Sequence, residues 1–358
     1  MPLATSGAKS GNTRGAWYGF SSTVTTPMPF PSSSLDTSPA VCRGRTPPGP
    51  GRDTTVALFA RALAGLVLTA ALAAPTAALA LVGGAGVAPN GADSPWSGVG
   101  SLNIAGGYFT GTLIAPGYVI TAAHLVAGRD PSSVSFQVNA SSSYTIAATQ
   151  IFVNPGYTGT AGGNAAGDPT SHDDIAIIKL ASAVSADVPV YGLYTGNLQG
   201  KDMTFVSYAG SATTKRTGEN VADYLFADTS GTKEVYLFDF DGPDLSTNRL
   251  GANIAANGTL GADREASLVG GDSGSSAFVN VNGEWQLAGI NTFQATFASG
   301  PTTSGQYGTG GGGVVLSSYS TWINSVVVTP VPEPHTWLLL LAGFGILGGI
   351  ASRRRSAP

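Results

Sequence analysis

The sequence predicts an all-β protein. Of its 358 residues only 11% are charged, against about a quarter in an average soluble domain, and 50 are Gly. Strong helix formers are therefore few and turn residues are many. From residue 96 to 326, short β-branched or aromatic runs, often alternating, are separated by Gly, Pro, Asn, Asp and Ser. This is the pattern of a β-barrel or β-sandwich.

The first 80 residues contain two segments. Residues 1–55 are rich in Pro, Ser, Gly and Thr and lack a sustained apolar period, so we expect them to be disordered. Residues 56–80 have the features of a signal peptide, with Arg61, an apolar run over 62–72 and then small residues. The run is shorter than the roughly 20 residues of a membrane-spanning helix. Because a signal peptide normally begins a protein, we hypothesise that the natural start lies near Val56, and the mass of the precursor would decide this.

Two A-x-A cleavage sites follow the apolar run, one ending at Ala73 and one at Ala80. Cleavage after Ala80 would expose the sequence Leu-Val-Gly-Gly, which starts at Leu81. Cleavage after Ala73 would leave a short extension before it. Both alternatives stay open at this point.

Residues 81–328 form the predicted folded body. Long surface loops are predicted over 156–169 and 239–261, and a helix over 317–328. The clearest predicted strands are Thr112–Ile114, Tyr118–Thr121, Ser133–Val138, Thr145–Phe152, Ile175–Leu180, Thr204–Tyr208, Val235–Phe238 and Gln286–Ile290.

Charge and cysteine content exclude several classes of function. The chain has a net charge of −4, but residues 81–326 contain 8 basic and 18 acidic residues. An acidic body repels phosphates, so we expect no nucleic-acid partner. The single cysteine, Cys42, lies in the leader, so the body has no disulfide and no cysteine-based metal site. The spacing of Asp239, Asp241 and Asp244 differs from a calcium-binding EF-hand, and we expect no metal ion.

Three short segments carry residues suited to nucleophilic catalysis. His124 ends the apolar run Val-Ile-Thr-Ala-Ala, and an imidazole is the usual base at neutral pH. Ser273 lies in Gly-Gly-Asp-Ser-Gly, a tight turn whose N–H groups could hold an oxyanion. Asp174 leads the apolar run Ile-Ala-Ile-Ile, where a carboxylate needs a partner such as an imidazole N–H. The neighbours offer alternatives, His172 as the base or Asp173 as the acid. Asp174 is favoured because it directly precedes the apolar run.

Together these segments resemble the trypsin/chymotrypsin family of serine proteases. The order His, Asp, Ser along the chain is the same, and Thr-Ala-Ala-His, Asp-Ile-Ala and Gly-Asp-Ser-Gly match its three motifs. The resemblance covers roughly residues 81–326. It implies two antiparallel six-stranded β-barrels, about 81–195 and 196–328, with the active site in the cleft between them and a closing C-terminal helix.

The resemblance also implies the roles of individual residues. Ser273 would be the nucleophile, His124 the base and Asp174 the residue that orients His124. The N–H groups of Gly271 and Ser273 would form the oxyanion hole. Peptide bonds of a protein or peptide substrate would be hydrolysed through an acyl-enzyme, without metal or cofactor.

Two further site predictions rest on the same resemblance. In the family, the freed amine of an Ile-Val-Gly-Gly start pairs with the aspartate before the nucleophile, and Leu81 and Asp272 occupy these positions here. The specificity pocket would involve Ser267, Thr292 and Gln294. Ser267 stands where enzymes that cleave after Arg or Lys carry an acid, so a neutral pocket for an apolar or small side chain is expected.

The C-terminal segment, residues 329–358, resembles the PEP-CTERM sorting signal of exported bacterial proteins. A Pro-Glu-Pro box ending at Pro334 is followed by an apolar stretch over 337–351 and by three arginines, 353–355. The resemblance implies a transient transmembrane helix, processing by signal peptidase and exosortase, and a final place at the cell surface or in the extracellular matrix of a Gram-negative-type bacterium. A permanent tail anchor is the alternative.

The sequence bears differently on two other classes of function. An α/β-hydrolase esterase needs G-x-S-x-G and a triad His after the Ser, whereas Ser275 breaks that motif and only His335 of the sorting segment follows. A non-catalytic relative that binds proteins at the cell surface or in the matrix keeps the fold and is the remaining alternative.

Overall fold

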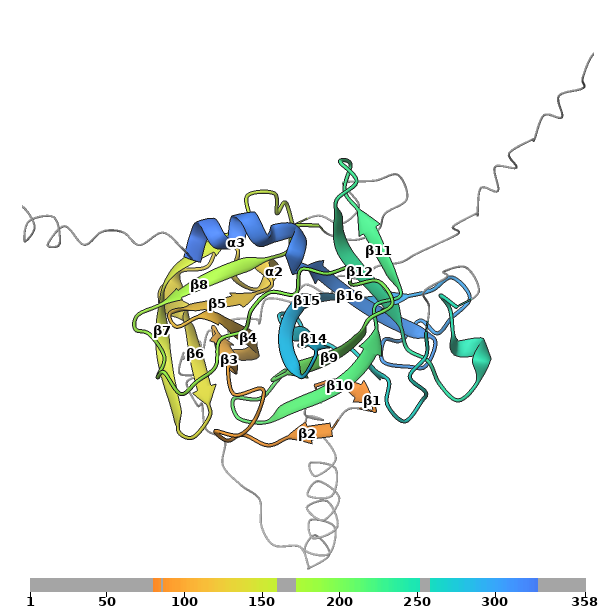
Figure 1. Cartoon of the computed structure of the whole chain (residues 1–358), viewed down its shortest axis with the longest axis horizontal. Helices are drawn as coiled ribbons and strands as arrows, with labels where there is room; N and C mark the ends of the chain where they lie inside the picture. The colour runs from red at the N-terminus through yellow and green to blue at the C-terminus, as the bar shows by residue number, and fades with distance from the viewer. Residues whose placement is uncertain (1–79, 85, 160–171, 252–257, 328–358) are drawn as a thin grey trace, which may run out of the picture. The chain divides into compact units, whose positions relative to one another are not determined.

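The structure is a computed structural model of the chain and describes residues 80–84, 86–159, 172–251 and 258–327 (Figure 1). These residues all belong to one compact unit. The predicted leader, nearly all of the predicted signal peptide and the predicted sorting segment with its transmembrane helix lie outside them. Among the described residues, no helix has the length and apolarity required to cross a membrane.

The first barrel is a closed sheet of six antiparallel strands. Its strands alternate in the way the sequence predicts: along β6, Val134, Phe136 and Val138 are buried, while Ser135 and Gln137 between them are partly exposed. The order around the barrel is β3 (Val99–Ile104), β4 (Gly107–Ala115), β5 (Tyr118–Thr121), β8 (Ala176–Leu180), β7 (Ser143–Val153) and β6 (Val134–Asn139). Short helices α2 (Ala123–Val126) and η1 (Pro131–Ser133) lie between β5 and β6.

The second barrel is built from a sheet of eight strands. Their order is β11 (Tyr224–Ala227), β12 (Lys233–Asp239), β16 (Thr309–Val315), β15 (Glu284–Thr296), β14 (Ser276–Val281), β9 (Asp202–Ser207), β10 (Lys215–Val221) and β2 (Gly86–Ala88). The short helix η2 (Leu245–Thr247) follows β12.

This sheet closes through a bend in one strand. Only residues 222 and 223 separate β10 from β11. The Ala222 N–H donates to the carbonyl of Lys201 beside β9 (3.0 Å), and the Asp223 N–H donates to the carbonyl of Leu237 in β12 (3.0 Å). β10 and β11 are therefore two parts of one bent strand, and β2 is a short additional edge strand beside β10. With β10 and β11 counted together and β2 left out, the sheet has six strands, in agreement with the predicted fold of two six-stranded barrels.

The segment that precedes the first barrel in sequence pairs with the second one. β1 (Val82–Gly83) forms an antiparallel pair with β13 (Ala266–Ser267), and β2 continues the sheet beside β10. Leu81 is fully buried in the apolar core of the second barrel, together with Phe205 and Phe238. Burying such a side chain contributes about 1.5–3 kcal/mol.

The C-terminal helical segment consists of η3 (Leu316–Tyr319) and α3 (Ser320–Val327). Tyr319 and Ile323 belong to the same buried apolar cluster as Val119 of the first barrel and Phe278 of the second. The predicted closing helix is therefore present, and one core extends across both barrels.

Candidate active site

His124 lies in the single helical turn α2, directly after β5. Ala122 and Ala123 before it are completely buried, so small side chains allow the turn to pack against the barrel end. Asp174 holds His124 twice. The backbone N–H of His124 donates to Asp174 Oδ1 (2.8 Å), and its Nδ1 lies 2.7 Å from Asp174 Oδ2. Because the carboxylate accepts at Nδ1, Nε2 is left as the acceptor of the ring.

Asp174 is buried in front of β8, as the sequence predicts. Its residue exposure is 4%, and the His124 contacts satisfy both carboxylate oxygens. Tyr157 faces the same region. Burial and, to a lesser extent, the Asp174 charge raise the pKa of the Tyr157 hydroxyl to about 12, so this neighbour is neutral.

The Ser273 turn packs against the residues that flank His124. A Cβ atom on Gly274 would lie 2.3 Å from Thr121 Oγ1 and 3.1 Å from Leu125 Cδ1. Gly274 has φ +80°, which also favours glycine. Ser273 is partly exposed, and its hydroxyl makes no hydrogen bond within the described part of the chain. Unliganded catalytic sites often tighten such contacts only when substrate binds.

Three N–H groups in this turn have no acceptor among the described residues, those of Gly270, Gly271 and Ser273. Between the last two, the Asp272 N–H donates to the carbonyl of Val269 (3.1 Å). The turn is fixed to Asn291 of β15, whose carbonyl accepts from the Gly274 N–H (2.9 Å). The N–H groups of Gly271 and Ser273, which are predicted to form the oxyanion hole, are therefore available to donate to a ligand.

Asp272 points into the protein, away from solvent. It is 1% exposed and accepts hydrogen bonds from the Ser207 hydroxyl (2.6 Å) and from the N–H groups of Val269 (2.7 Å) and Leu81 (3.1 Å). Burial raises the pKa of the Asp272 carboxyl to about 6, although these hydrogen bonds favour its ionised form. The structure therefore brings the predicted pair Leu81 and Asp272 together.

Glycine is required where the N-terminal segment enters the second barrel. A Cβ atom on Gly83 would lie 2.4 Å from the Phe240 ring and 2.5 Å from the carbonyl of Glu265, and Gly83 has φ +86°. The next N–H, that of Gly84, donates to the same Glu265 carbonyl (2.6 Å). Leu81 thus reaches Asp272 through a segment in which Gly83 leaves no room for a side chain.

The predicted specificity residues lie on two strands that are not paired with each other: β13, which pairs with β1, and β15 of the eight-stranded sheet. Ser267 in β13 and Thr292 in β15 are buried, and the hydroxyl of each has no hydrogen-bond partner among the described residues. Gln294 in β15 is partly exposed and pairs with Gly311 of β16. A Cβ atom on Gly311 would lie 2.9 Å from Leu268, next to Ser267. Through Gly311 and Leu268, Gln294 therefore lies near the segment that carries Ser267, and none of the three predicted residues is charged.

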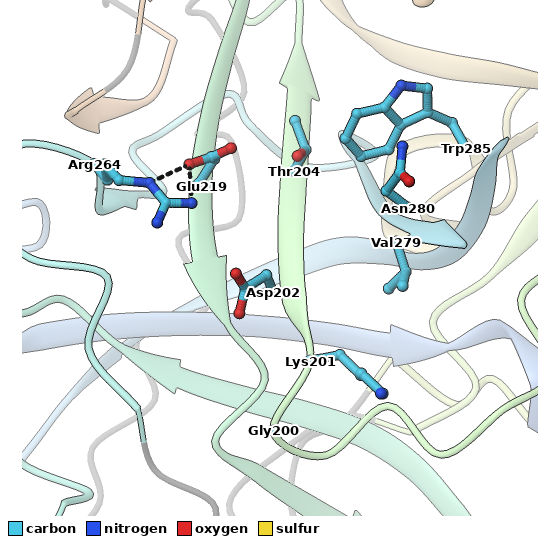
Figure 2. A pocket seen from close by; sticks show the side chains of 9 residues that line it. All are labelled: Gly200, Lys201, Asp202, Thr204, Glu219, Arg264, Val279, Asn280 and Trp285. Atoms are coloured by element: carbon cyan, nitrogen blue, oxygen red, sulfur yellow. Dashed lines mark hydrogen bonds and ion pairs between the residues drawn. The ribbon is translucent and has the colours of Figure 1, made fainter. Parts of the chain in front are cut away.

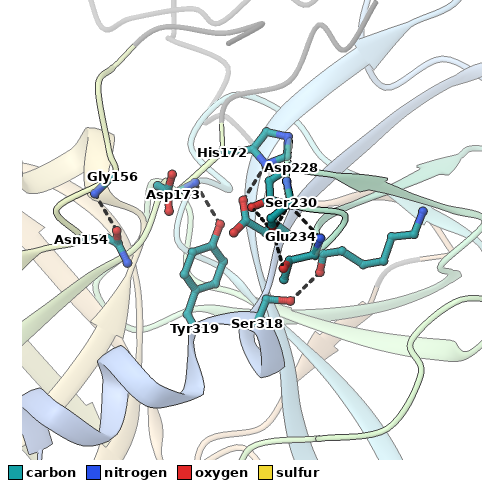
Figure 3. A network of polar contacts seen from close by, with 11 residues as sticks. Asn154, Gly156, His172, Asp173, Asp228, Ser230, Glu234, Ser318 and Tyr319 are labelled. Carbon is teal, nitrogen blue, oxygen red and sulfur yellow. Dashed lines mark hydrogen bonds and ion pairs between the residues drawn. The ribbon is translucent and has the colours of Figure 1, made fainter. Parts of the chain in front are cut away.

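The two sequence alternatives, His172 and Asp173, lie in a different network (Figure 3). His172 Nδ1 lies 2.8 Å from Glu234 Oε2 in β12, and the Asp173 N–H donates to the Tyr319 hydroxyl (3.0 Å). The Asp173 carboxylate contacts Gly156. Burial and then the Glu234 charge raise the pKa of the Asp173 carboxyl. This network ties the segment before Asp174 to the second barrel.

The sequence interpretation did not identify the partners that support these residues. Glu234, Ser207 and Tyr236 all contribute, the last by donating to Asn291 Oδ1 (2.6 Å). Each lies on a strand of the second barrel, far in sequence from the residue it supports. No local motif marks them, so only the fold reveals them.

A cluster of buried carboxylates lies behind the N-terminal segment. Asp223, Asp239, Asp241 and Glu265 are each at most 3% exposed. Within the part of the chain that the structure describes, neither carboxylate oxygen of Asp241 has a hydrogen-bond partner, whereas Asp244 accepts from the N–H of Ser246 (2.9 Å). No group of three or more His, Cys, Asp or Glu side chains with metal-binding geometry occurs among the described residues.

Comparisons with known families agree with both resemblances. A model of the trypsin family matches residues 81–323, and a model of the PEP-CTERM protein-sorting motif matches residues 330–355. No curated protein matches the chain. The sorting motif indicates export and targeting to the cell surface or beyond, in a Gram-negative bacterium.

Proposed function

The chain belongs to the trypsin family, and from this premise we propose that it is a secreted serine endopeptidase. The observation that carries the proposal is the double contact of Asp174 with His124, at its N–H and at Nδ1, beside the turn that presents Ser273. A structural histidine needs one partner, whereas this arrangement fixes both the position and the tautomer of the ring.

The proposed mechanism uses these groups in order. Ser273 Oγ attacks the scissile carbonyl carbon while His124 Nε2 takes its proton, and Asp174 stabilises the imidazolium. The carbonyl oxygen becomes an oxyanion, which the N–H groups of Gly271 and Ser273 bind, a contribution of about 10²–10³ in rate for one such donor. His124 then protonates the leaving amine. Water hydrolyses the acyl-enzyme by the same steps in reverse.

Cleavage before Leu81 is proposed as the activating event. It would convert the Leu81 N–H, 3.1 Å from Asp272 Oδ2, into an ammonium group. A cation at that distance stabilises an ionised carboxylate and would lower the pKa of Asp272 from its value of about 6. The ion pair would fix the turn that carries Gly271 and Ser273. N-terminal sequencing of the exported protein tests this step, and a mature start at Ala74 would contradict it.

The proposed substrate is a protein or peptide with an apolar or small side chain before the scissile bond. The buried hydroxyls of Ser267 and Thr292 offer neutral polar groups and no carboxylate for Arg or Lys. Signal peptidase and exosortase are the proposed processing enzymes, with transient membrane association through the C-terminal segment. The extracellular matrix is one proposed destination.

The decisive experiment is labelling of the exported, naturally processed protein with a fluorophosphonate, read by intact mass. A Ser273→Ala protein is the matched control. We expect one adduct on the native protein and none on the control. No adduct on native protein that starts at Leu81 and shows a cooperative unfolding transition would refute the proteolytic function and favour the non-catalytic, protein-binding alternative.

A further inference from the structure

A groove lies on the outer side of the second barrel, separate from the residues of the proposed triad. It consists of two cavities, of about 460 and 420 Å³, that share Thr204, Glu219, Arg264 and Trp285 as lining residues (Figure 2). Four shared residues make the cavities neighbours in one groove. Each volume falls in the range of small-molecule sites, about 300–1,000 Å³.

The position of the groove separates it from the nucleophile turn. It is lined by Val279 and Asn280 near the end of β14, whereas Ser276 at the start of that strand follows the Ser273 turn. At about 3.3 Å per residue, four residues place the groove about 13 Å along the strand from the turn. A ligand in the groove would therefore not occupy the oxyanion hole.

One side of the groove is formed by the indole of Trp285, which packs against other aromatic side chains. Trp285 lines both cavities, and its ring centroid lies 4.7 Å from that of Trp96, which is 7% exposed. Trp96 in turn packs on Phe278, with ring centroids 5.0 Å apart. This stack holds the indole in place, so a ligand that packs on it does not have to order it first.

The opposite side carries a solvent-exposed ion pair that offers both hydrogen-bond donors and acceptors. Figure 2 shows Arg264 and Trp285 on opposite sides of Thr204. Arg264 Nε and Nη2 both contact Oε2 of Glu219, at 2.9 and 2.8 Å. Glu219 and Thr204 are direct cross-strand partners, which places their side chains on one face of the sheet. Arg264 Nη1 and Glu219 Oε1 take no part in this ion pair, so both can face a ligand.

The charges along the groove largely cancel. Arg264 and Lys201 are opposed by Glu219, Asp202 and Asp263, all of which line one cavity or both. A strongly anionic ligand would meet three carboxylates and a strongly cationic one two basic groups. The lining instead suits an uncharged molecule with an apolar face for the indole and many hydroxyl groups for the charged pair.

We propose that this groove binds a chain of neutral sugars. A pyranose ring presents axial C–H groups to an aromatic face and equatorial hydroxyls to charged hydrogen-bonding groups, which are stronger partners than neutral ones. The two joined cavities accommodate consecutive sugar units, one on each side of the Arg264–Glu219 pair. The site would hold the protein on a polysaccharide while the proposed triad stays accessible.

The test measures binding of neutral oligosaccharides to the full, naturally processed chain in its Ser273→Ala form, which cannot digest itself. Cellohexaose and chitohexaose are the probes, polygalacturonate is the charged comparison, and tryptophan fluorescence and calorimetry are the readouts. We expect a neutral hexasaccharide to bind. Trp285→Ala should weaken the association at least tenfold, and Glu219→Gln should weaken it several-fold.

Controls separate loss of the site from loss of the fold. Trp322→Ala removes a partly buried tryptophan from α3, outside the groove, and should leave binding unchanged. Trp285→Phe keeps an aromatic platform and should retain most of the affinity. Binding that survives Trp285→Ala in a folded protein would overturn the proposal. So would failure of both neutral sugars to bind, or groove-dependent binding of unfolded casein in their place, which would identify a polypeptide site.

Discussion

The two histidines among the described residues each contact a carboxylate through Nδ1 at nearly the same distance, but their side chains differ in exposure to solvent. His124 Nδ1 lies 2.7 Å from Asp174, and His172 Nδ1 lies 2.8 Å from Glu234. The His124 side chain is 18% exposed, whereas that of His172 is 1% exposed. His124 is also held at its backbone N–H, beside the Ser273 turn. Contact between an imidazole and a carboxylate is therefore not sufficient to identify a catalytic histidine. His124 differs from His172 because it is accessible and lies beside a candidate nucleophile.

The two histidines also differ in the elements of the fold that they connect. Asp174 and His124 both belong to the first barrel, and Gly274, next to Ser273, packs against Thr121 and Leu125 on either side of His124. His172 and Tyr319 connect the segment before Asp174 to β12 and η3. Asp173 within that segment has φ +59°, a backbone conformation that is unfavourable for a non-glycine residue. We infer that the second histidine helps to hold this strained segment, and with it Asp174, in place.

The largest expected difference in activity is between the two variants in which one histidine is replaced by asparagine. His124→Asn should lower kcat/KM by about 10⁴–10⁶, since it removes the proposed base. His172→Asn should lower it less than tenfold but should destabilise the fold by about 1–3 kcal/mol, because Glu234 loses its partner. Peptide hydrolysis and denaturant unfolding measure the two effects. Equal losses of activity in two folded variants would show that the comparison is wrong.

The next largest difference in activity is expected between the variants that replace the histidine-bound carboxylates of Asp174 and Glu234 by amides. Asp174→Asn should lower kcat by about 10⁴, because an amide cannot stabilise the imidazolium and can leave the ring in the wrong tautomer. Glu234→Gln keeps an oxygen that can accept from His172 Nδ1, so we expect less than a tenfold change. The measurement is kcat at saturating peptide substrate across pH 5 to 9. A Glu234→Gln effect as large as that of Asp174→Asn would assign Glu234 to the catalytic machinery.

The sequence gives clearer signals for the proposed triad residues than for the parts of the fold that support them. His124, Asp174 and Ser273 lie in short motifs, and strand β5 has the predicted bounds, because local sequence determines both. Strand β16 was not predicted, since Gly310–Gly313 disfavour a strand. Glycine is needed in this strand because the neighbouring backbone leaves no room for a side chain: a Cβ atom on Gly310 would lie 2.1 Å from the carbonyl of Phe238. The bend that closes the second barrel and the pairing of His172 with Glu234 depend on contacts between distant segments, which no local pattern encodes.

The buried carboxylates beside the N-terminal segment extend the comparison to acids without a histidine partner. Burial, followed by the charges of Asp239 and Glu265, raises the pKa of the Asp241 carboxyl to about 7. Burial and the nearby Asp239 raise that of Asp223 to about 9. In the unfolded chain such groups titrate near 4. The folded state therefore binds more protons between pH 4 and these values, and its stability decreases as pH rises through that range.

Because stability decreases as pH rises, we expect Tm to be lower at pH 8.5 than at pH 5. This is the smallest of the three predicted effects. Ser273→Ala protein should be used so that self-digestion does not interfere. Asp241→Asn keeps the shape of the side chain and removes its titration, so its Tm should decrease less over the same interval. Solvent near the cluster screens the charge, and a difference of roughly 3–6 °C between the two proteins is expected, equivalent to about 1–2 kcal/mol in a domain of this size. Identical pH profiles would mean that the Asp241 carboxylate acquires a compensating cation when it ionises, and the contrast with the histidine-paired acids would then be lost.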